Sequence, residues 1–261
     1  MVGSDSIGFA SQPTPFAASD SYLLILFFRK NGVLACPFNL GGNIGHGSAS
    51  FVETVEIDVK LKAIALNCTL KPKGQSSTDA MIKVLGDAFA KVDVEVTETI
   101  RVAQHDVKPG VTSDEGDGDE WPVIRRKILA HDILILGGPI WMGQLGSIAK
   151  RVLERMDAFL SETDAAGRMP SYGKVAVMAI VGNEDGAHFP SAQGFQSLND
   201  TGWTIPPSAT CYWVGEAMGS IDFKDLKKTP AKVLESAAMV ATNAAHLAKL
   251  LKQNPIPGAR S

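Results

Sequence analysis

The chain has 261 residues, a formal net charge of −3 and 45% hydrophobic residues. This length and apolar content suffice for one sizeable domain or two small ones. The near-neutral charge and the lack of a lysine/arginine cluster argue against nucleic acid as a main partner, because binding to the phosphate backbone requires a basic face. A small-molecule ligand is the better expectation.

Cysteine usage and hydropathy indicate a protein of a reducing, aqueous compartment. Cys36, Cys68 and Cys211 are far apart, without a Cys-x-x-Cys pair or a nearby histidine to complete a metal-ligand spacing. No apolar run approaches the roughly 20 residues that a membrane helix requires. The longest, residues 22–28, has acidic residues before it and basic ones after it, the reverse of a signal peptide. We therefore expect reduced thiols, no metal, no membrane association and a cytoplasmic location.

Residues 1–58 differ from the rest of the chain in composition and in hydrophobic periodicity. They carry scattered serine, glycine and proline, and they sustain no period of 2 or 3.6. The glycine-rich segment 41–47 lacks the Gly-x-Gly-x-x-Gly spacing of a nucleotide loop, and Pro37 breaks the run before it. The sequence predicts an irregular, flexible N-terminal extension over residues 1–58, outside the functional unit.

From Leu61 onward, apolar strand-like runs alternate with segments of helical spacing. Strands are predicted near residues 61–66, 92–100, 133–136, 174–181 and 209–214, and helices near 81–89, 120–130, 149–160, 191–199 and 233–251. This alternation predicts an α/β fold, a doubly wound, five-stranded parallel sheet with helices on both faces. We place this domain at residues 59–254, followed by a C-terminal tail at 255–261.

Residues 112–119 form a polar, acidic loop ahead of the predicted helix at 120–130. Its carboxylates could hold a cation. A solvated loop whose last members cap the helix is the interpretation that we favour, since acidic residues are common at helix starts.

Three of the predicted strands end in unusual loops, at residues 68–78, 139–146 and 182–188. In open parallel sheets, ligands bind beyond the carboxyl ends of the strands, so these loops are expected to form one site. The first loop combines hydroxyls with helix N-terminal amides but lacks the Gly-Lys-[Ser/Thr] ending of a P-loop, which suits a phosphate that is held rather than transferred. The second is apolar and carries Trp141, which can face a planar ring. The third is glycine-rich and lets the backbone approach closely.

A phosphate at one end and a flat ring at the other describe flavin mononucleotide (FMN). The predicted cofactor-binding residues come from these three loops and are Thr69, Ser76, Ser77, Thr78, Pro139, Ile140, Trp141, Met142, Gly143, Gly182, Asn183, Glu184, Asp185 and Gly186.

At these loops the chain resembles the flavodoxin-like family, in particular the NAD(P)H-dependent FMN reductases. The resemblance covers about residues 61–252 and is carried by segments 67–72 and 76–78, 138–143 and 182–186. It implies a sheet in the order 2-1-3-4-5, the FMN phosphate on the first loop and the isoalloxazine between the second and third. It also implies a homodimer or homotetramer, because reductases of this kind often complete the flavin pocket across an interface.

Several of these residues have a structural alternative. Residues 76–78 could simply cap a helix, Trp141 could be a core or interface residue, and His188 could face solvent. Cys68 followed by a phosphate loop is also the layout of the low-molecular-weight tyrosine phosphatases, in which an arginine stands six positions after the cysteine. Gly74 stands there in this chain, and the loop contains no arginine. Cys68 is therefore interpreted as a packing residue.

The residues and the resemblance together predict an FMN-dependent oxidoreductase. It would transfer hydride from NADH or NADPH through FMN to a quinone, a free flavin or another small acceptor. The flavin carries the chemistry, so no catalytic side chain is assigned. One alternative is a flavodoxin-like electron carrier that binds FMN without oxidising nicotinamide, although a net charge of −3 gives little electrostatic steering toward a partner. Another is a binding module with an empty pocket.

Overall fold

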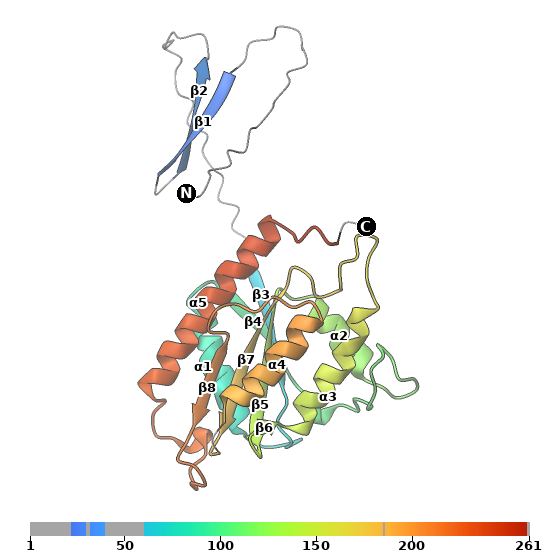
Figure 1. Ribbon diagram of the computed structural model, residues 1–261. Coiled ribbons are helices and arrows are strands. Elements are labelled where there is room, and N and C mark those ends of the chain that lie inside the picture. Colours follow the sequence, from blue (N-terminus) through green and yellow to red (C-terminus); the bar gives the residue numbers. More distant parts are fainter. Residues whose placement is uncertain (1–21, 30–31, 40–59, 185, 260–261) are drawn as a thin grey trace, which may run out of the picture. The chain divides into compact units, whose positions relative to one another are not determined.

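The computed structural model describes residues 22–29, 32–39, 60–184 and 186–259, and the chain divides into two compact units, residues 1–58 and 59–261. In the first unit, β1 (Tyr22–Arg29) and β2 (Gly32–Asn39) pair antiparallel (Figure 1). The sequence predicted no regular element in residues 1–58, and for these two strands the prediction was wrong. The apolar run at 22–28 was considered only as a membrane span or a signal peptide, although a continuous run of this length is also consistent with a strand.

Five parallel strands form the sheet of the second unit, in the order β4-β3-β5-β7-β8 (Figure 1). The strands are β3 (Leu61–Asn67), β4 (Val94–Arg101), β5 (Ile133–Trp141), β7 (Val175–Gly182) and β8 (Thr210–Val214). When these five parallel strands alone are numbered along the chain, the order is 2-1-3-4-5, so the predicted flavodoxin-like fold class is confirmed. A short strand, β6 (Gln144–Leu145), folds back antiparallel on the end of β5.

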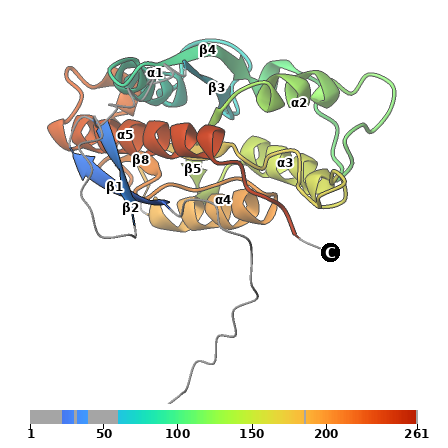
Figure 2. The ribbon, with the colours of Figure 1, turned by 90° about the horizontal axis from the view of Figure 1, so that it is seen from above.

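Helices cover both faces of the sheet. They are α1 (Ser77–Ala90), α2 (Trp121–Leu129), α3 (Ser147–Met156), α4 (His188–Asp200) and α5 (Ala231–Gln253), with 3₁₀ turns η1 (Val102–Gln104), η2 (Asp157–Leu160) and η3 (Phe223–Asp225). One apolar core lies between the sheet and α1 with α5, and the other between the sheet and α2, α3 and α4. Figure 2 shows α1 and α5 on one side of the strands and α2 and α3 on the other.

The central strands are apolar on both faces, which explains their continuous hydrophobic sequence. In β7, Val175 to Val181 are all buried, and successive residues enter opposite cores: Val177 packs toward α1 and α5, and Met178 toward α2 to α4. The edge strand β4 instead alternates buried or partly buried residues with exposed ones over most of its length. Polar chemistry on the central strands is therefore confined to their ends. Among the described residues, none of the helices has the length and apolar character needed to cross a membrane.

The sequence predicted that the acidic loop at residues 112–119 is solvated, but one of its carboxylates is buried. The Asp119 carboxylate is fully buried and forms a 2.7 Å ion pair with Arg155 of α3, which is itself buried. Arg155 also donates to the carbonyl oxygens of Lys108 and Thr112, both at 3.0 Å, so one guanidinium anchors the loop at both ends. The capping expectation is met in part, since Asp119 Oδ1 accepts the N–H of Trp121 at the start of α2.

We expect the ion pair between Asp119 and Arg155 to make the free energy of unfolding depend on pH in the acid range. Burial by itself would raise the pKa of Asp119, but hydrogen bonds from Arg155 and from the backbone of Glu115 outweigh it and lower the pKa from 3.8 to about 2. The stabilisation is therefore complete above pH 3.8 and is lost as the pH falls toward 2.

We expect Asp119→Asn to lower the free energy of unfolding at pH 7 by about 3–5 kcal/mol, because it leaves Arg155 buried without a counter-charge. Denaturant titration at pH 7 and pH 3 measures this, and the difference between wild type and variant should shrink at the lower pH. Asp87→Asn, which breaks an exposed pair with Lys83, is the control and should change stability little. An Asp119→Asn protein as stable as wild type at pH 7 would contradict the assignment.

Candidate functional site

A cavity opens at the carboxyl edge of the sheet, next to the point where strand order reverses between β3 and β5. The loops after β3, β5, β7 and β8 contribute to it. Its walls are formed by Thr69, Leu70, Lys71, Ser76, Ser77, Thr78, Pro139, Ile140, Trp141, Val181, Gly182, Asn183, Trp213, Asp222 and Phe223. The structure thus brings together residues that are more than a hundred positions apart in the sequence.

Most of the predicted cofactor-binding residues line this cavity, namely Thr69, Ser76, Ser77, Thr78, Pro139, Ile140, Trp141, Gly182 and Asn183. Met142, Gly143, Glu184 and Gly186 are not among the lining residues, and Asp185 lies outside the described residues. Met142 is 85% exposed with φ of 52°, and the Gly143 N–H donates to Glu184 Oε2 at 3.3 Å. The hydrogen bond between Gly143 and Glu184 joins the second loop to the third.

The start of α1 forms the polar end of the cavity. Ser76 is the N-cap residue: its hydroxyl accepts the Asp79 N–H, while Asp79 accepts the N–H of Ser76, a reciprocal capping box. The Ser76 hydroxyl also donates to Asp79, so both of its hydrogen-bonding functions are engaged. The structural alternative considered for this residue is therefore realised, and the hydroxyls that follow it are the better candidates for a ligand.

Ser77 and Thr78 present free donors at this end. Their backbone N–H groups have no acceptor among the described residues, and they lie at the positive end of the helix dipole. The Ser77 hydroxyl oxygen accepts the Lys224 N–H at 3.4 Å, which leaves its own proton available. Lys71 lines the same cavity and adds a positive charge. This set of donors suits an anion such as a phosphate monoester.

Aromatic and apolar side chains also line the cavity. Trp141 lines the cavity with its side chain 49% exposed, and Trp213 packs against Phe223 with ring centroids 5.5 Å apart. Ile140 is buried and lies so close to Gly182 that a Cβ on this glycine would stand 3.0 Å from the Cβ of Ile140. A planar ring placed here would meet flat, apolar walls.

Six lining residues were not predicted from the sequence: Leu70, Lys71, Val181, Trp213, Asp222 and Phe223. Trp213 stands near the carboxyl end of a predicted strand, so the rule that directed attention to the other three loops could also have identified it. Asp222 and Phe223 enter through the η3 turn, which follows the edge strand β8 after an irregular segment. No sequence signal indicates that this turn folds back against α1.

Cys68 is unsuited to nucleophilic chemistry. Its side chain is fully buried in the core beside α2 and α3, and burial raises the pKa of its thiol far above the usual range. Its interpretation as a packing residue is consistent with this environment. His188, at the start of α4, does not line the cavity, and its ring packs edge-on against Tyr212 at 5.5 Å.

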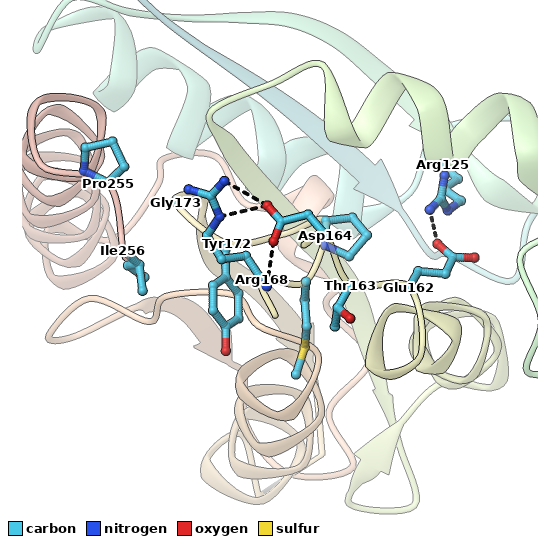
Figure 3. A pocket seen from close by; sticks show the side chains of 11 residues that line it. Arg125, Glu162, Thr163, Asp164, Arg168, Tyr172, Gly173, Pro255 and Ile256 are labelled. Atoms are coloured by element: carbon cyan, nitrogen blue, oxygen red, sulfur yellow. Dashed lines mark hydrogen bonds and ion pairs between the residues drawn. The ribbon is translucent and has the colours of Figure 1, made fainter. Parts of the chain in front are cut away.

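A second, larger cavity lies among residues that precede β7 and follow α5 (Figure 3). Its volume is about 610 Å³, against about 150 Å³ for the cavity at the carboxyl edge. Its charged groups, however, are already matched: Arg125 pairs with Glu162, and Arg168 pairs with Asp164. Because it offers neither a helix N-terminus nor an aromatic wall of comparable size, we assign the ligand site to the carboxyl edge.

Comparison with known proteins gives a consistent result. A family model described as NADPH-dependent FMN reductase matches residues 61–217. The 8-demethyl-8-aminoriboflavin-5′-phosphate synthase of Streptomyces davaonensis is 32% identical over 208 residues, which cover 75% of this chain and 80% of that protein. The crystal structure of RosB with the bound intermediate 8-demethyl-8-formylriboflavin-5′-phosphate superposes with a TM-score of 0.67 and 30% identity, covering 76% of this chain and 82% of that one.

A further relative matches over a smaller part of its length. The divalent metal cation transporter MntH of Mycobacterium bovis is 38% identical over 162 residues, which cover 60% of this chain. They cover 24% of the transporter, so the chain spans about a quarter of the length of that relative.

The capping role of Ser76 is open to a direct test. We expect Ser76→Ala to lower the free energy of unfolding by about 1 kcal/mol, because it removes the N-cap hydrogen bond of α1. Ser77→Ala is the matched control, since Ser77 lies one position later and does not cap the helix. Urea denaturation of the two variants measures the difference. Equal stability of Ser76→Ala and wild type would show that the capping box does not hold this end of α1.

Proposed function

The chain belongs to the NADPH-dependent FMN reductase family, and from this premise we propose that the cavity at the carboxyl edge binds FMN. The protein would then take hydride from NADH or NADPH and pass electrons to a quinone, a free flavin or another small acceptor. The observation that carries the proposal is that one cavity is lined by two kinds of group: free N–H groups and a hydroxyl at Ser77 and Thr78, and the aromatic side chains of Trp141 and Trp213.

The residues present fit this ligand. A phosphate monoester matches the donors at the start of α1, and an isoalloxazine matches an apolar wall with exposed tryptophan. The cavity volume of about 150 Å³ is below the roughly 300–1,000 Å³ of sites that enclose a drug-sized ligand. Part of a flavin would therefore remain outside the cavity, which suits a ring that must meet nicotinamide and acceptor in turn.

The chain would contribute binding and orientation. When bound, the flavin supplies the hydride and electron transfer, so no side chain has to act as acid or base. The loops that would orient it are fixed to each other: the Asn183 side-chain amide donates to the Gly219 carbonyl at 2.7 Å, and the Met218 N–H donates to the Asn183 carbonyl at 2.9 Å. Such fixed walls reduce the freedom that a bound ring loses on reaction.

A second candidate function treats the flavin as the substrate. The Streptomyces davaonensis relative is named as a synthase of an aminoriboflavin phosphate, and RosB was crystallised with a formylriboflavin phosphate. A cavity that holds a phosphate and a flavin ring would serve either role. Mass analysis of the flavin recovered after turnover separates them, because a reductase returns FMN unchanged and a flavin-modifying enzyme does not.

An electron-carrier role and self-association also stay predictions. Steady-state NADPH oxidation without an added partner protein would separate the reductase from a flavodoxin-like carrier.

Exposed apolar side chains on the loops of the carboxyl edge support a homodimer or homotetramer: Leu70, Trp141, Met142, Met218 and Ile221 are each at least 44% exposed. Burial of such side chains against a second copy would be favourable. Light scattering coupled to size exclusion measures the oligomeric state.

Flavin titration tests the proposal itself. We expect the purified protein to bind added FMN at micromolar concentration, with a shift of the flavin absorbance, and to oxidise NADH or NADPH when a quinone is present. Absence of FMN binding at this concentration would overturn the proposal.

Ser77→Ala tests the phosphate end. We expect it to weaken FMN binding roughly ten- to hundredfold, as for the loss of one hydrogen bond to a charged group. Ser197→Ala is the control, because the Ser197 hydroxyl bonds to the Gln193 carbonyl within α4 and does not line the cavity. Unchanged FMN affinity across Ser76→Ala, Ser77→Ala and Thr78→Val would count against a phosphate at this position.

A further inference from the structure

Arg101, the last residue of β4, holds the loop between β3 and α1 by hydrogen bonds without lining the cavity itself. We infer that Arg101 is a positioning residue that gives this site its preference for a phosphorylated flavin over an unphosphorylated one. The inference rests on the proposed FMN site. Arg101 does not line the cavity, so it would act through the loop that it holds and through Asp79.

The guanidinium spans the loop between β3 and α1. Its NH1 group donates to the carbonyl oxygens of Lys71 at 3.2 Å and Gly74 at 2.7 Å, and its NH2 group pairs with Asp79 Oδ2. These two carbonyls accept no other hydrogen bond among the described residues. The Arg101 side chain is 16% exposed. A planar fork with several fixed donors suits this geometry, which a lysine cannot reproduce.

The positive charge of Arg101 matters for anion binding because Asp79, its ion-pair partner, places a negative charge at the start of α1. Its carboxylate lies at the third position of α1, where it accepts from the Ser76 backbone and hydroxyl and from the Asn67 side-chain amide. A carboxylate there is favourable for the helix, but it competes with a phosphate for the same positive end of the dipole. The guanidinium beside it offsets the negative charge. The capped helix start can therefore also receive an anion.

Asn67 extends the same arrangement toward β3. Its side chain is fully buried, donates to Asp79 Oδ1 and accepts the Thr69 N–H at 3.0 Å. Arg101, Asp79 and Asn67 thus connect the ends of β4 and β3 to the start of α1. The connection positions Thr69 and Lys71, both of which line the cavity. None of these contacts reaches Trp141 or Trp213, so their loss should affect the phosphate end and spare the ring.

Two flavins separate these effects. Riboflavin has the ring and the ribityl chain of FMN but no phosphate, so its affinity reports on everything except the phosphate end. Dissociation constants of both ligands are measured by flavin fluorescence on the full chain, for wild type, Arg101→Met and Arg101→Lys. We expect Arg101→Met to weaken FMN binding roughly ten- to hundredfold through the loss of charged hydrogen bonds and to leave riboflavin binding unchanged. Arg101→Lys should fall between, since it keeps the charge but not the fork.

Removing the uncompensated charge should reverse part of the loss. The double variant Arg101→Met with Asp79→Asn is expected to bind FMN more tightly than Arg101→Met alone, an effect that a general loss of stability would not produce. Arg168→Met is the matched control, because Arg168 pairs with Asp164 away from this cavity. It should leave the affinities for both flavins unchanged.

The outcomes separate this inference from the proposal beneath it. Equal weakening of FMN and riboflavin in the Arg101 variants, or no weakening of FMN, would overturn the role of Arg101 while the FMN site stands. A wild-type protein that binds both flavins equally, or neither, would overturn the phosphate site itself. If Arg101→Met does not fold, Arg101→Lys decides the question with the same two ligands.

Discussion

Burial of the central strands on both faces is the constraint on which the site depends. β3, β5 and β7 pack against helices on either side, so most of their side chains are buried in the two apolar cores. Their loops emerge together at the carboxyl edge, where the backbone groups of the turns and the start of α1 become available. The polar groups that could bind a ligand therefore lie at the carboxyl edge, because the buried central strands offer few elsewhere.

At this edge of the sheet, some polar groups stabilise the fold and others remain available to a ligand. The Ser76 hydroxyl is engaged in capping α1, whereas the N–H groups of Ser77 and Thr78 remain free. Asp79 stabilises the helix start, and Arg101 offsets the charge that Asp79 brings. A helix start can thus be well capped and still able to bind an anion. Trp141 and Trp213 line the same cavity and supply flat surfaces that need no such compensation.

Much of this could be predicted from the sequence, because the signals were local. Continuous apolar runs identified the central strands, and hydroxyls before a helical stripe located the start of α1. Features set by distant partners were not predictable. Asp119 reads as one of several solvated acids until Arg155 of α3 is placed beside it, and Asp222 reaches the cavity only because η3 folds back against α1. Likewise, nothing near Arg101 in the sequence indicates the loop that it holds.

We propose that the FMN phosphate lies at the start of α1 with the ring against the tryptophans. A crystal structure of the protein with FMN tests it most directly. We expect phosphate oxygens at about 3 Å from the backbone nitrogens of Ser77 and Thr78, and the isoalloxazine in contact with Trp141 or Trp213. A flavin bound elsewhere, for example in the cavity beside Arg168 and Tyr172, or one with its phosphate away from α1, would contradict it.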